Sequence, residues 1–334
     1  MKNSFKNCIS LRNKFIIISI VFLLILLIVS YIFGKLVYNS SVGLEQLIKN
    51  EDIVKIFSER KDKPLEKLKN YKTSELMIQS SNNYKLESLF ITSNIKTRDT
   101  MILVHGIGSS YYEMLKVAYR YLDKGYNVLV YNQRNTGNSG GDNYTFGLYE
   151  RYDLDSLVKF VKNKFPEGRL GVHGFSMGAG TAAMHSEINS KDDKVDFYIL
   201  DSPYSEMKDA IRMGVLEKRI PDILINYVVT CGDLYNKFKS GFWYSDVKPY
   251  ESVEKSNVPI LFIHGTKDTV CNYQNSKKMY DLVKHDKKDL WLIEGIGHVD
   301  GFEHDSTVYF NKIFKFIAVS YTHLRAHETL RYLV

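Results

Sequence analysis

Residues 169–180, Arg-Leu-Gly-Val-His-Gly-Phe-Ser-Met-Gly-Ala-Gly, constrain the fold more than any other part of the chain. A short apolar run leads into Gly174-Phe175-Ser176-Met177-Gly178, and small, helix-compatible residues follow. A strand that reverses sharply into a helix strains the backbone at the turn and crowds the positions two residues before and after it, which only glycine tolerates. The spacing therefore predicts a strand, a tight turn and a helix, with the Ser176 side chain exposed at the turn.

Glycine and serine also pair in ordinary turns, so the motif needs support from the rest of the chain. Further strands are predicted at 101–105, 127–131, 195–200, 259–265 and 290–293, and helices near 112–122, 151–164, 276–283 and 307–317. This alternation predicts an α/β fold, a mostly parallel sheet with helices on both faces. The runs on either side of Ser81-Asn82-Asn83 predict an antiparallel hairpin over 75–91 that precedes it. We place this domain at residues 73–318.

Residues 204 to about 250 interrupt the alternation. They carry helical patterns rich in Met, Ile, Tyr and Phe, with Pro221 between them and an aromatic cluster at Phe242-Trp243-Tyr244. We expect this segment to be a helical lid inserted over the site.

Residues 15–33 hold 19 positions without a charge, which is long enough to cross the hydrocarbon core of a bilayer as a helix. No convincing cleavage site follows, so we predict an uncleaved signal anchor. Residues 1–14 carry Lys2, Lys6, Arg12 and Lys14 without an acidic residue. The positive-inside rule therefore predicts a single-pass protein of the cell membrane, with a cytoplasmic N-terminus and an extracytoplasmic domain.

Two further segments lie outside the regular pattern. Residues 34–72 are polar and charged and are expected to form a stalk or a first cap of the domain. Residues 319–334 do not continue the preceding pattern and are interpreted as a non-native tail.

Composition narrows the possible functions. The chain has 334 residues, enough for one large domain with an accessory segment, and its net charge of +7 is dispersed among 38 acidic residues. We therefore expect no nucleic-acid partner. The three cysteines lack metal-ligand spacing, so no metal is expected. Cys231 and Cys271 either pair outside the cytoplasm or stay as buried thiols. Neither common phosphate-loop spacing is present, which argues against a nucleotide cofactor.

A serine hydroxyl needs a base to take its proton during attack on a carbonyl. His105, His173 and His264 each stand at a strand end before glycine and are expected to fill structural positions. His298 follows the last predicted strand in a glycine-rich loop that can reach across the strand ends, so we predict that it is the base. The alternative is His304.

The base in turn needs a carboxylate that fixes its tautomer. Asp268 lies just beyond a strand end, between Ser176 and His298 in the chain, and gives the order Ser, Asp, His. Asp201, which ends the preceding strand, is the competing acid, although a turn or helix-cap role before Ser202-Pro203 is favoured for it.

Two backbone donors must stabilise the oxyanion that forms during attack. The N–H of Met177, directly after the serine, is the first predicted donor. The second is expected from the glycine-rich loop His105-Gly106-Ile107-Gly108, where we choose Ile107.

With these features assembled, the chain resembles the α/β-hydrolase superfamily over roughly residues 75–318. The matching features are His105-Gly106, the loop 133–139, the turn 174–178, the stretch 259–268 and Gly297-His298. Within the superfamily it is similar to the membrane-anchored bacterial branch that resembles serine aminopeptidases and monoacylglycerol-lipase-like esterases. The resemblance implies a cofactor-free serine hydrolase with Ser176, Asp268 and His298 as its triad.

The expected reaction is hydrolysis of an acyl ester through an acyl-enzyme. An apolar lid beside a bilayer favours an acyl-chain substrate, so a carboxylesterase or a lysophospholipase or acylglycerol lipase is predicted. The alternatives are a peptidase similar to the serine aminopeptidases and a catalytically silent hydrolase fold that binds a partner. The oligomeric state is left open.

Overall fold

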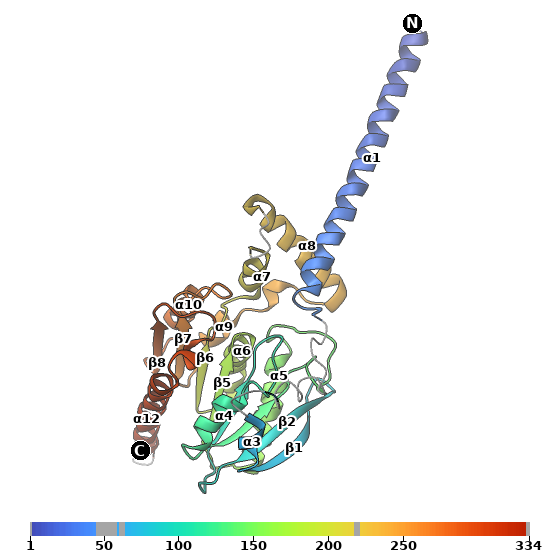
Figure 1. Ribbon diagram of the computed structural model, residues 1–334. Coiled ribbons are helices and arrows are strands. Elements are labelled where there is room, and N and C mark those ends of the chain that lie inside the picture. The colour runs from blue at the N-terminus through green and yellow to red at the C-terminus, as the bar shows by residue number, and fades with distance from the viewer. Residues whose placement is uncertain (1, 45–58, 60–63, 217–220, 332–334) are drawn as a thin grey trace.

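The computed structural model describes residues 2–44, 59, 64–216 and 221–331 (Figure 1). These residues form an eight-stranded sheet in the order β1-β2-β4-β3-β5-β6-β7-β8. The strands are β1 (Lys72–Gln79), β2 (Lys85–Thr92), β3 (Thr100–Val104), β4 (Asn127–Tyr131), β5 (Leu170–Phe175), β6 (Phe197–Asp201), β7 (Ile260–Gly265) and β8 (Lys288–Ile293). β1 and β2 form the predicted antiparallel hairpin, β2 pairs antiparallel with β4, and the strands from β4 to β8 are parallel.

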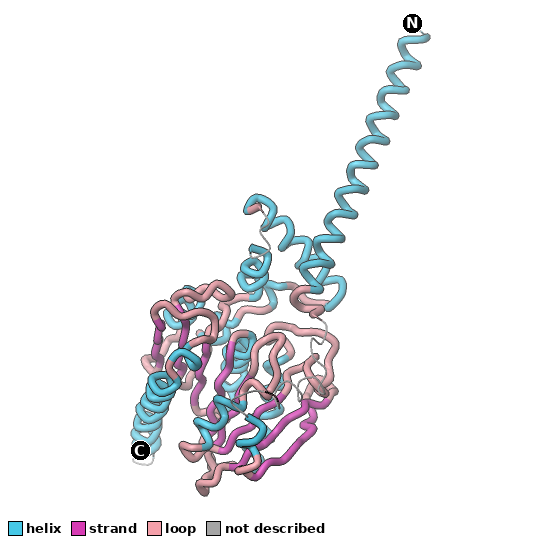
Figure 2. Tube along the Cα trace, in the orientation of Figure 1, coloured by secondary structure: helices cyan, strands magenta, loops and turns pink. Residues whose placement is uncertain are grey.

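Helices cover both faces of this sheet (Figure 2). In the main domain they are α4 (Leu115–Leu122), α5 (Glu150–Lys164), α6 (Met177–Asp192), α10 (Gln274–Leu282), α11 (Gly301–His304) and α12 (Ser306–Arg331). The predicted mostly parallel α/β fold is therefore confirmed.

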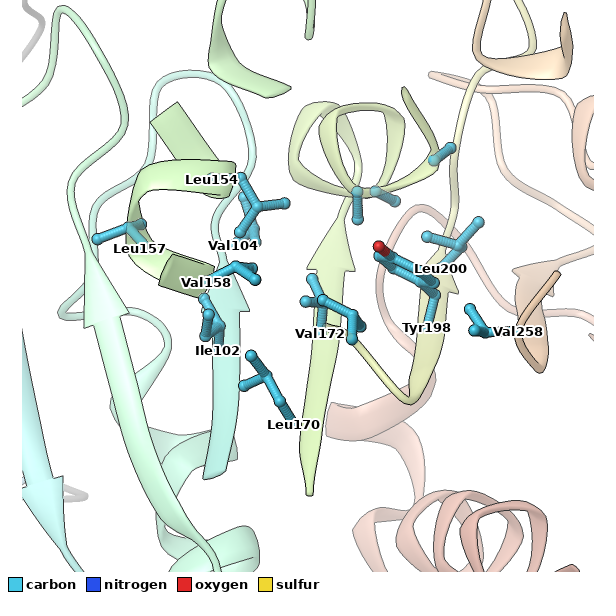
Figure 3. Packing of buried hydrophobic residues seen from close by; sticks show 14 of the residues in the cluster. Ile102, Val104, Leu154, Leu157, Val158, Leu170, Val172, Tyr198, Leu200 and Val258 are labelled. Atoms are coloured by element: carbon cyan, nitrogen blue, oxygen red, sulfur yellow. The ribbon is translucent and has the colours of Figure 1, made fainter. Parts of the chain in front are cut away.

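Alternate residues of the central strands build two cores. In β3, Ile102 and Val104 join the core under α5 and α6, whereas Met101 and Leu103 join the core under α4 and α12. Figure 3 shows the first of these cores, with Leu154 of α5 packed near the β3 side chains. Successive side chains of a strand point to opposite faces of the sheet, so a strand that is buried on both faces needs an unbroken apolar run. The run 101–104 therefore predicts a central parallel strand.

The N-terminal helix α1 (Lys2–Asn39) stands out from the domain (Figure 1). An 18-residue stretch of its part Asn13–Asn39 has a mean hydropathy of 3.2, and this part is long and apolar enough to cross a membrane. Residues 2–14 of the predicted basic segment and the predicted span 15–33 belong to one continuous helix. The apolar side chains from Phe15 to Ile28 are exposed, whereas Val37 and Tyr38 near the end of the helix are buried.

The predicted stalk has two described ends, and both pack on the domain. Val37 and Val42 are buried in a third apolar cluster, and the carbonyl of Val42 accepts a hydrogen bond from the Tyr144 N–H at 3.0 Å. The short helix α3 (Pro64–Leu68) is tied to α4 by the Tyr119 hydroxyl, which donates to the Pro64 carbonyl. Residues 45–58 and 60–63 lie outside the described residues. The assignment of residues 34–72 as a stalk or a first cap stays a prediction.

The inserted segment is helical, as predicted. It contains α7 (Met207–Leu216), α8 (Asp222–Ser240), a short 3-10 helix η1 (Tyr244–Asp246) and α9 (Pro249–Val253). Toward the other end of the chain, α12 is longer than the predicted helix 307–317 and extends into the segment interpreted as a tail, as far as Arg331. The non-native origin of residues 319–334 stays a prediction.

Candidate active site

The turn between β5 and α6 has the strained geometry that the motif predicts. Ser176 has φ 53° and ψ −117°, a backbone conformation that residues other than glycine rarely adopt. A Cβ atom on Gly174 would lie 2.3 Å from the Gly178 carbonyl oxygen, and one on Gly178 would lie 2.1 Å from the Val104 carbonyl oxygen. Only glycine fits at either position, so the chain can place Ser176 at the carboxyl edge of the sheet.

Three predicted residues meet at this edge. The Ser176 Oγ lies 2.8 Å from His298 Nε2, and His298 Nδ1 lies 2.6 Å from Asp268 Oδ2. Asp268 follows β7 and His298 follows β8, so two neighbouring strand ends supply the acid and the base. The arrangement lets His298 accept the serine proton at Nε2 while Nδ1–H donates to the carboxylate.

Asp268 is buried and held by several donors. Its Oδ1 accepts hydrogen bonds from the backbone N–H groups of Val270 at 2.9 Å and Cys271 at 2.8 Å. Burial raises the pKa of Asp268, but the hydrogen bonds from His264 and His298 outweigh it and hold the pKa well below the ordinary value. The carboxylate is therefore charged at neutral pH.

His264 is a contact of the acid that the sequence analysis missed. This fully buried side chain has Nε2 3.0 Å from Asp268 Oδ2 and 2.9 Å from the Cys271 carbonyl oxygen, and Nδ1 2.7 Å from Ser276 Oγ. Both neighbours of Nε2 are acceptors, so Nε2 carries the proton and the Ser276 hydroxyl donates to Nδ1. The sequence feature that indicates this contact is the position of His264 at a strand end, four residues before Asp268.

The competing residues have other surroundings. Asp201 accepts hydrogen bonds from the Tyr309 hydroxyl at 2.5 Å and the Ser202 hydroxyl at 3.0 Å, and burial raises its pKa. These contacts replace the turn or cap role expected for Asp201, because they tie β6 to α12. His304 is an exposed residue at the end of α11. In the described chain, neither side chain is hydrogen-bonded to Ser176 or His298, and Asp201 contacts Ser176 through its backbone carbonyl, which accepts the Ser176 N–H at 2.9 Å.

Two strand-end histidines have the structural positions that were predicted for them. His105 Nε2 accepts the Gln133 N–H at 2.9 Å, and His173 lies between the hydroxyls of Tyr121 and Tyr309. Burial lowers the pKa of His105 to about 4 and that of His173 to about 3. Both rings are neutral at pH 7.

The predicted oxyanion donors flank the serine. Met177 begins α6, and the first N–H groups of a helix have no acceptor within the helix. Gly106 lies against the serine, because a Cβ atom there would stand 3.3 Å from Ser176 Cβ. Ile107 follows it and lines the cavity beside the serine. The donor roles of Ile107 and Met177 stay predictions.

A cavity of about 280 Å³ opens next to Ser176 and His298. Its walls come from the loop after β3, from α4 and from the loop and short helix after β8, and most are apolar. They include Ile107, Met114, Val117, Phe175, Val299 and Phe302, with Glu113, Lys116 and Glu303 among the polar lining groups. Lys116 and Glu303 form an ion pair.

None of the wall residues belongs to the inserted segment 204–250. In the described chain, Met207 of α7 and Val229 of α8 instead share the third apolar cluster with Met177 and Val37. The insert thus packs between the site and the end of α1, and its function as a lid stays a prediction.

Cys231 and Cys271 are both free and buried, which decides between the two alternatives for them. Within the described ranges, no group of three or more His, Cys, Asp or Glu side chains is arranged to hold a metal ion.

The family described as Serine aminopeptidase, S33 (Hydrolase_4) matches residues 95–240 and 247–305, more than half of the chain. The chain belongs to this family. The S33 protein is 28% identical to YqkD of Bacillus subtilis over 270 residues, which are 80% of this chain and 87% of YqkD.

It is also 25% identical to the Lysophosphatidylserine lipase ABHD12 of Danio rerio over 169 residues, 49% of this chain and 41% of that protein. Among solved structures, the Pyrococcus furiosus esterase Pf2001 superposes with a TM-score of 0.62 and 26% identity, covering 76% of this chain and 95% of the esterase. The S33 protein is therefore an α/β hydrolase with esterase-like and lipase-like relatives.

Proposed function

We propose that the S33 protein is a membrane-anchored serine hydrolase that cleaves an acyl ester through an acyl-enzyme. The observation that carries the proposal is the hydrogen-bonded chain from Ser176 through His298 to Asp268 beside an apolar cavity. Such a chain is the arrangement that activates a serine hydroxyl for attack on a carbonyl carbon.

In the first step, Ser176 Oγ attacks the acyl carbonyl while His298 Nε2 takes the hydroxyl proton. Asp268 stabilises the resulting imidazolium through Nδ1–H, and the N–H groups of Met177 and Ile107 donate to the oxyanion. His298 then gives the proton to the leaving alkoxide, which departs as an alcohol. In the second step, water attacks the acyl-enzyme with His298 again as base, which releases the acid and restores Ser176.

The substrate we propose is an ester with an acyl chain, as in short carboxylic esters, acylglycerols or lysophospholipids. The apolar walls at Met114, Val117 and Phe302 suit a hydrocarbon chain. The relatives named as an esterase and a lysophosphatidylserine lipase support the same class.

A peptidase is the second candidate, since the family is described by an aminopeptidase. Glu113 and Glu303 line the cavity, and a carboxylate is the group that would bind a peptide amino terminus.

The membrane part of the proposal rests on α1. The uncharged run 15–33 of this helix follows four basic residues, which favours a cytoplasmic N-terminus and a domain outside the cell. Protease added to intact cells should digest the domain, and a domain that is digested only after lysis would contradict this orientation.

The test of function is hydrolysis of a panel of short esters, acylglycerols, lysophospholipids and aminoacyl amides by the full chain in detergent micelles. We expect ester cleavage that Ser176→Ala abolishes and that the control Ser109→Ala, a serine of the same cavity, retains. Cleavage of the amides alone would favour the peptidase. Equal activity of Ser176→Ala and the unchanged chain would contradict the mechanism.

A further inference from the structure

Helix α8 is apolar on two opposite faces. Ile225, Val228 and Val229 are buried in the third apolar cluster, which packs on the domain. At 100° per residue, Ile223, Leu234 and Phe238 fall in one stripe on the other face. These three side chains are 88%, 49% and 84% exposed. Apolar side chains exposed to water on the face away from the domain are unfavourable, so the stripe favours an apolar partner beyond the domain.

The neighbour of α8 is the helix that is long enough to cross a membrane. Tyr227 donates its hydroxyl proton to Ser30 Oγ at 2.6 Å, because the Ser30 hydroxyl itself donates to the Leu26 carbonyl at 2.7 Å. Ser30 lies inside the uncharged run 15–33. The side chain of Tyr227 therefore reaches the apolar run itself.

The two helices run in the same direction from the point where they touch. Their closest approach is at Gly34, where a Cβ atom would lie 2.7 Å from the Cys231 carbonyl oxygen. One turn further along both helices, the Tyr38 and Tyr235 rings are 5.4 Å apart. Figure 1 shows the start of α8 on the same side of this contact as the projecting part of α1.

The first turn of α8 therefore extends toward the bilayer. The nine residues from Ile223 to Cys231 span about 12 Å of helix axis. Amphipathic helices at a membrane surface bury their apolar face by about 5–10 Å, so the start of α8 is long enough to enter this layer even when inclined.

We propose that the start of α8, where the exposed Ile223 lies, enters the headgroup and acyl boundary of the bilayer that α1 spans. The occupant is lipid, because the start of α8 lies beside the apolar run of α1, whose own exposed surface needs lipid. The proposal rests on the membrane anchor of the proposed function. It makes the insert a second membrane contact that holds the domain against the surface.

This contact also reaches the active site. The inner face of α8 shares the third cluster with Met177, the residue after the proposed nucleophile. The packed side chains of this cluster thus connect α8 with the site. A substrate that lies in the outer leaflet would then meet the enzyme at a fixed height above the membrane.

The test places an environment-sensitive dye on single cysteines of the full chain, in a background with Cys8→Ser, Cys231→Ala and Cys271→Ala, in vesicles of phosphatidylcholine and phosphatidylglycerol. Lipids brominated on their acyl chains quench a dye that is in the hydrocarbon boundary. We expect quenching at Ile223→Cys and at Phe22→Cys, which reports on α1. We expect none at Met77→Cys, a control on β1 of similar chemistry that is 48% exposed.

The outcomes separate this inference from the anchor. Quenching at position 22 without quenching at 223 overturns the inference and leaves the anchor. A lack of quenching at 22 overturns the anchor and the inference together. A dye at 223 that is protected from a water-soluble quencher but not quenched by the lipids indicates a protein partner, and the inference is then wrong.

A charge on the stripe provides a functional readout. Ile223→Lys is expected to raise KM severalfold for an ester carried in vesicles and to leave kcat/KM for a short soluble ester unchanged, since Ile223 is exposed and outside the cavity. Equal kinetics of the variant and the unchanged chain on both substrates would overturn the inference.

Discussion

The histidine behind the acid allows a sharp prediction. His264→Leu removes the Nε2–H group that donates to Asp268 and to the Cys271 carbonyl, and its place is too buried for water to substitute freely. A hydrogen bond to a charged group contributes about 1.5–3 kcal/mol. If that interaction is expressed in the transition state, where Asp268 must stabilise the His298 imidazolium, kcat falls about tenfold to a hundredfold.

The same change shifts the pH dependence. The hydrogen bond from His264 lowers the pKa of Asp268, so its removal raises that pKa toward the value that burial favours. When the pH is lowered, a carboxyl group with a raised pKa is protonated earlier, at a higher pH. The acid limb of kcat against pH should therefore move to higher pH in His264→Leu.

The assay is hydrolysis of a short soluble ester across the pH range, with thermal unfolding measured in parallel. His264→Gln is the matched variant, because its amide retains an N–H donor, and it should recover part of the rate and the original acid limb. The reasoning is refuted if His264→Leu lowers only the thermal stability and keeps both kcat and the pH profile, since a purely structural histidine would behave in that way.

Three other perturbations have defined outcomes. Gly178→Ala places a Cβ atom against the backbone of Val104 and should lower the melting temperature and abolish activity. The control Gly214→Ala, whose Cβ atom lies in open space on α7, should not destabilise the fold. Equal melting temperatures of the two variants would contradict the crowding at the turn. Burial raises the pKa of Asp153 to about 6, so the folded chain binds this proton more tightly than the unfolded chain, and its contribution to stability falls as pH rises from about 4 to about 6. Asp153→Asn should remove that part of the slope in thermal unfolding, and an unchanged slope would refute the shift. Tyr227→Phe removes the donor to Ser30 and should lower the free energy of unfolding in micelles by about 1 kcal/mol, while a loss of zero would show that the hydroxyl pair contributes nothing.

Local patterns predicted the elements that depend on neighbouring residues. The strand 127–131 is found at the predicted residues, because five consecutive buried positions need an apolar run between polar ends. The turn at Ser176 was predictable for a similar reason, since its glycines are required by contacts within the motif and with the adjacent strand.

The contacts that sequence reasoning missed join distant segments. The pairing of Ser30 with Tyr227 joins residues 197 apart, and no periodicity in either helix specifies the other as its partner. Residues 34–44 were therefore placed in a stalk or cap without their contact to α8. His264 was missed because a buried strand-end histidine looks the same in sequence whether it faces a carbonyl or a carboxylate.

The chain order Ser, Asp, His was enough to select three residues that the fold brings into hydrogen-bond contact. It was not enough to identify the walls of the cavity. Those walls come from α4 and from the segment 298–303 rather than from the insert, because the insert packs toward α1.

The central claim is that Ser176 is the nucleophile. The most direct measurement is mass spectrometry of the full chain after reaction with a fluorophosphonate, which bonds covalently to an activated serine. We predict one adduct on the peptide that contains Ser176, absent from Ser176→Ala, retained in Ser109→Ala, and slowed in His298→Ala, which lacks the base. An adduct that persists in Ser176→Ala, or an unlabelled chain that still hydrolyses esters, would contradict the account.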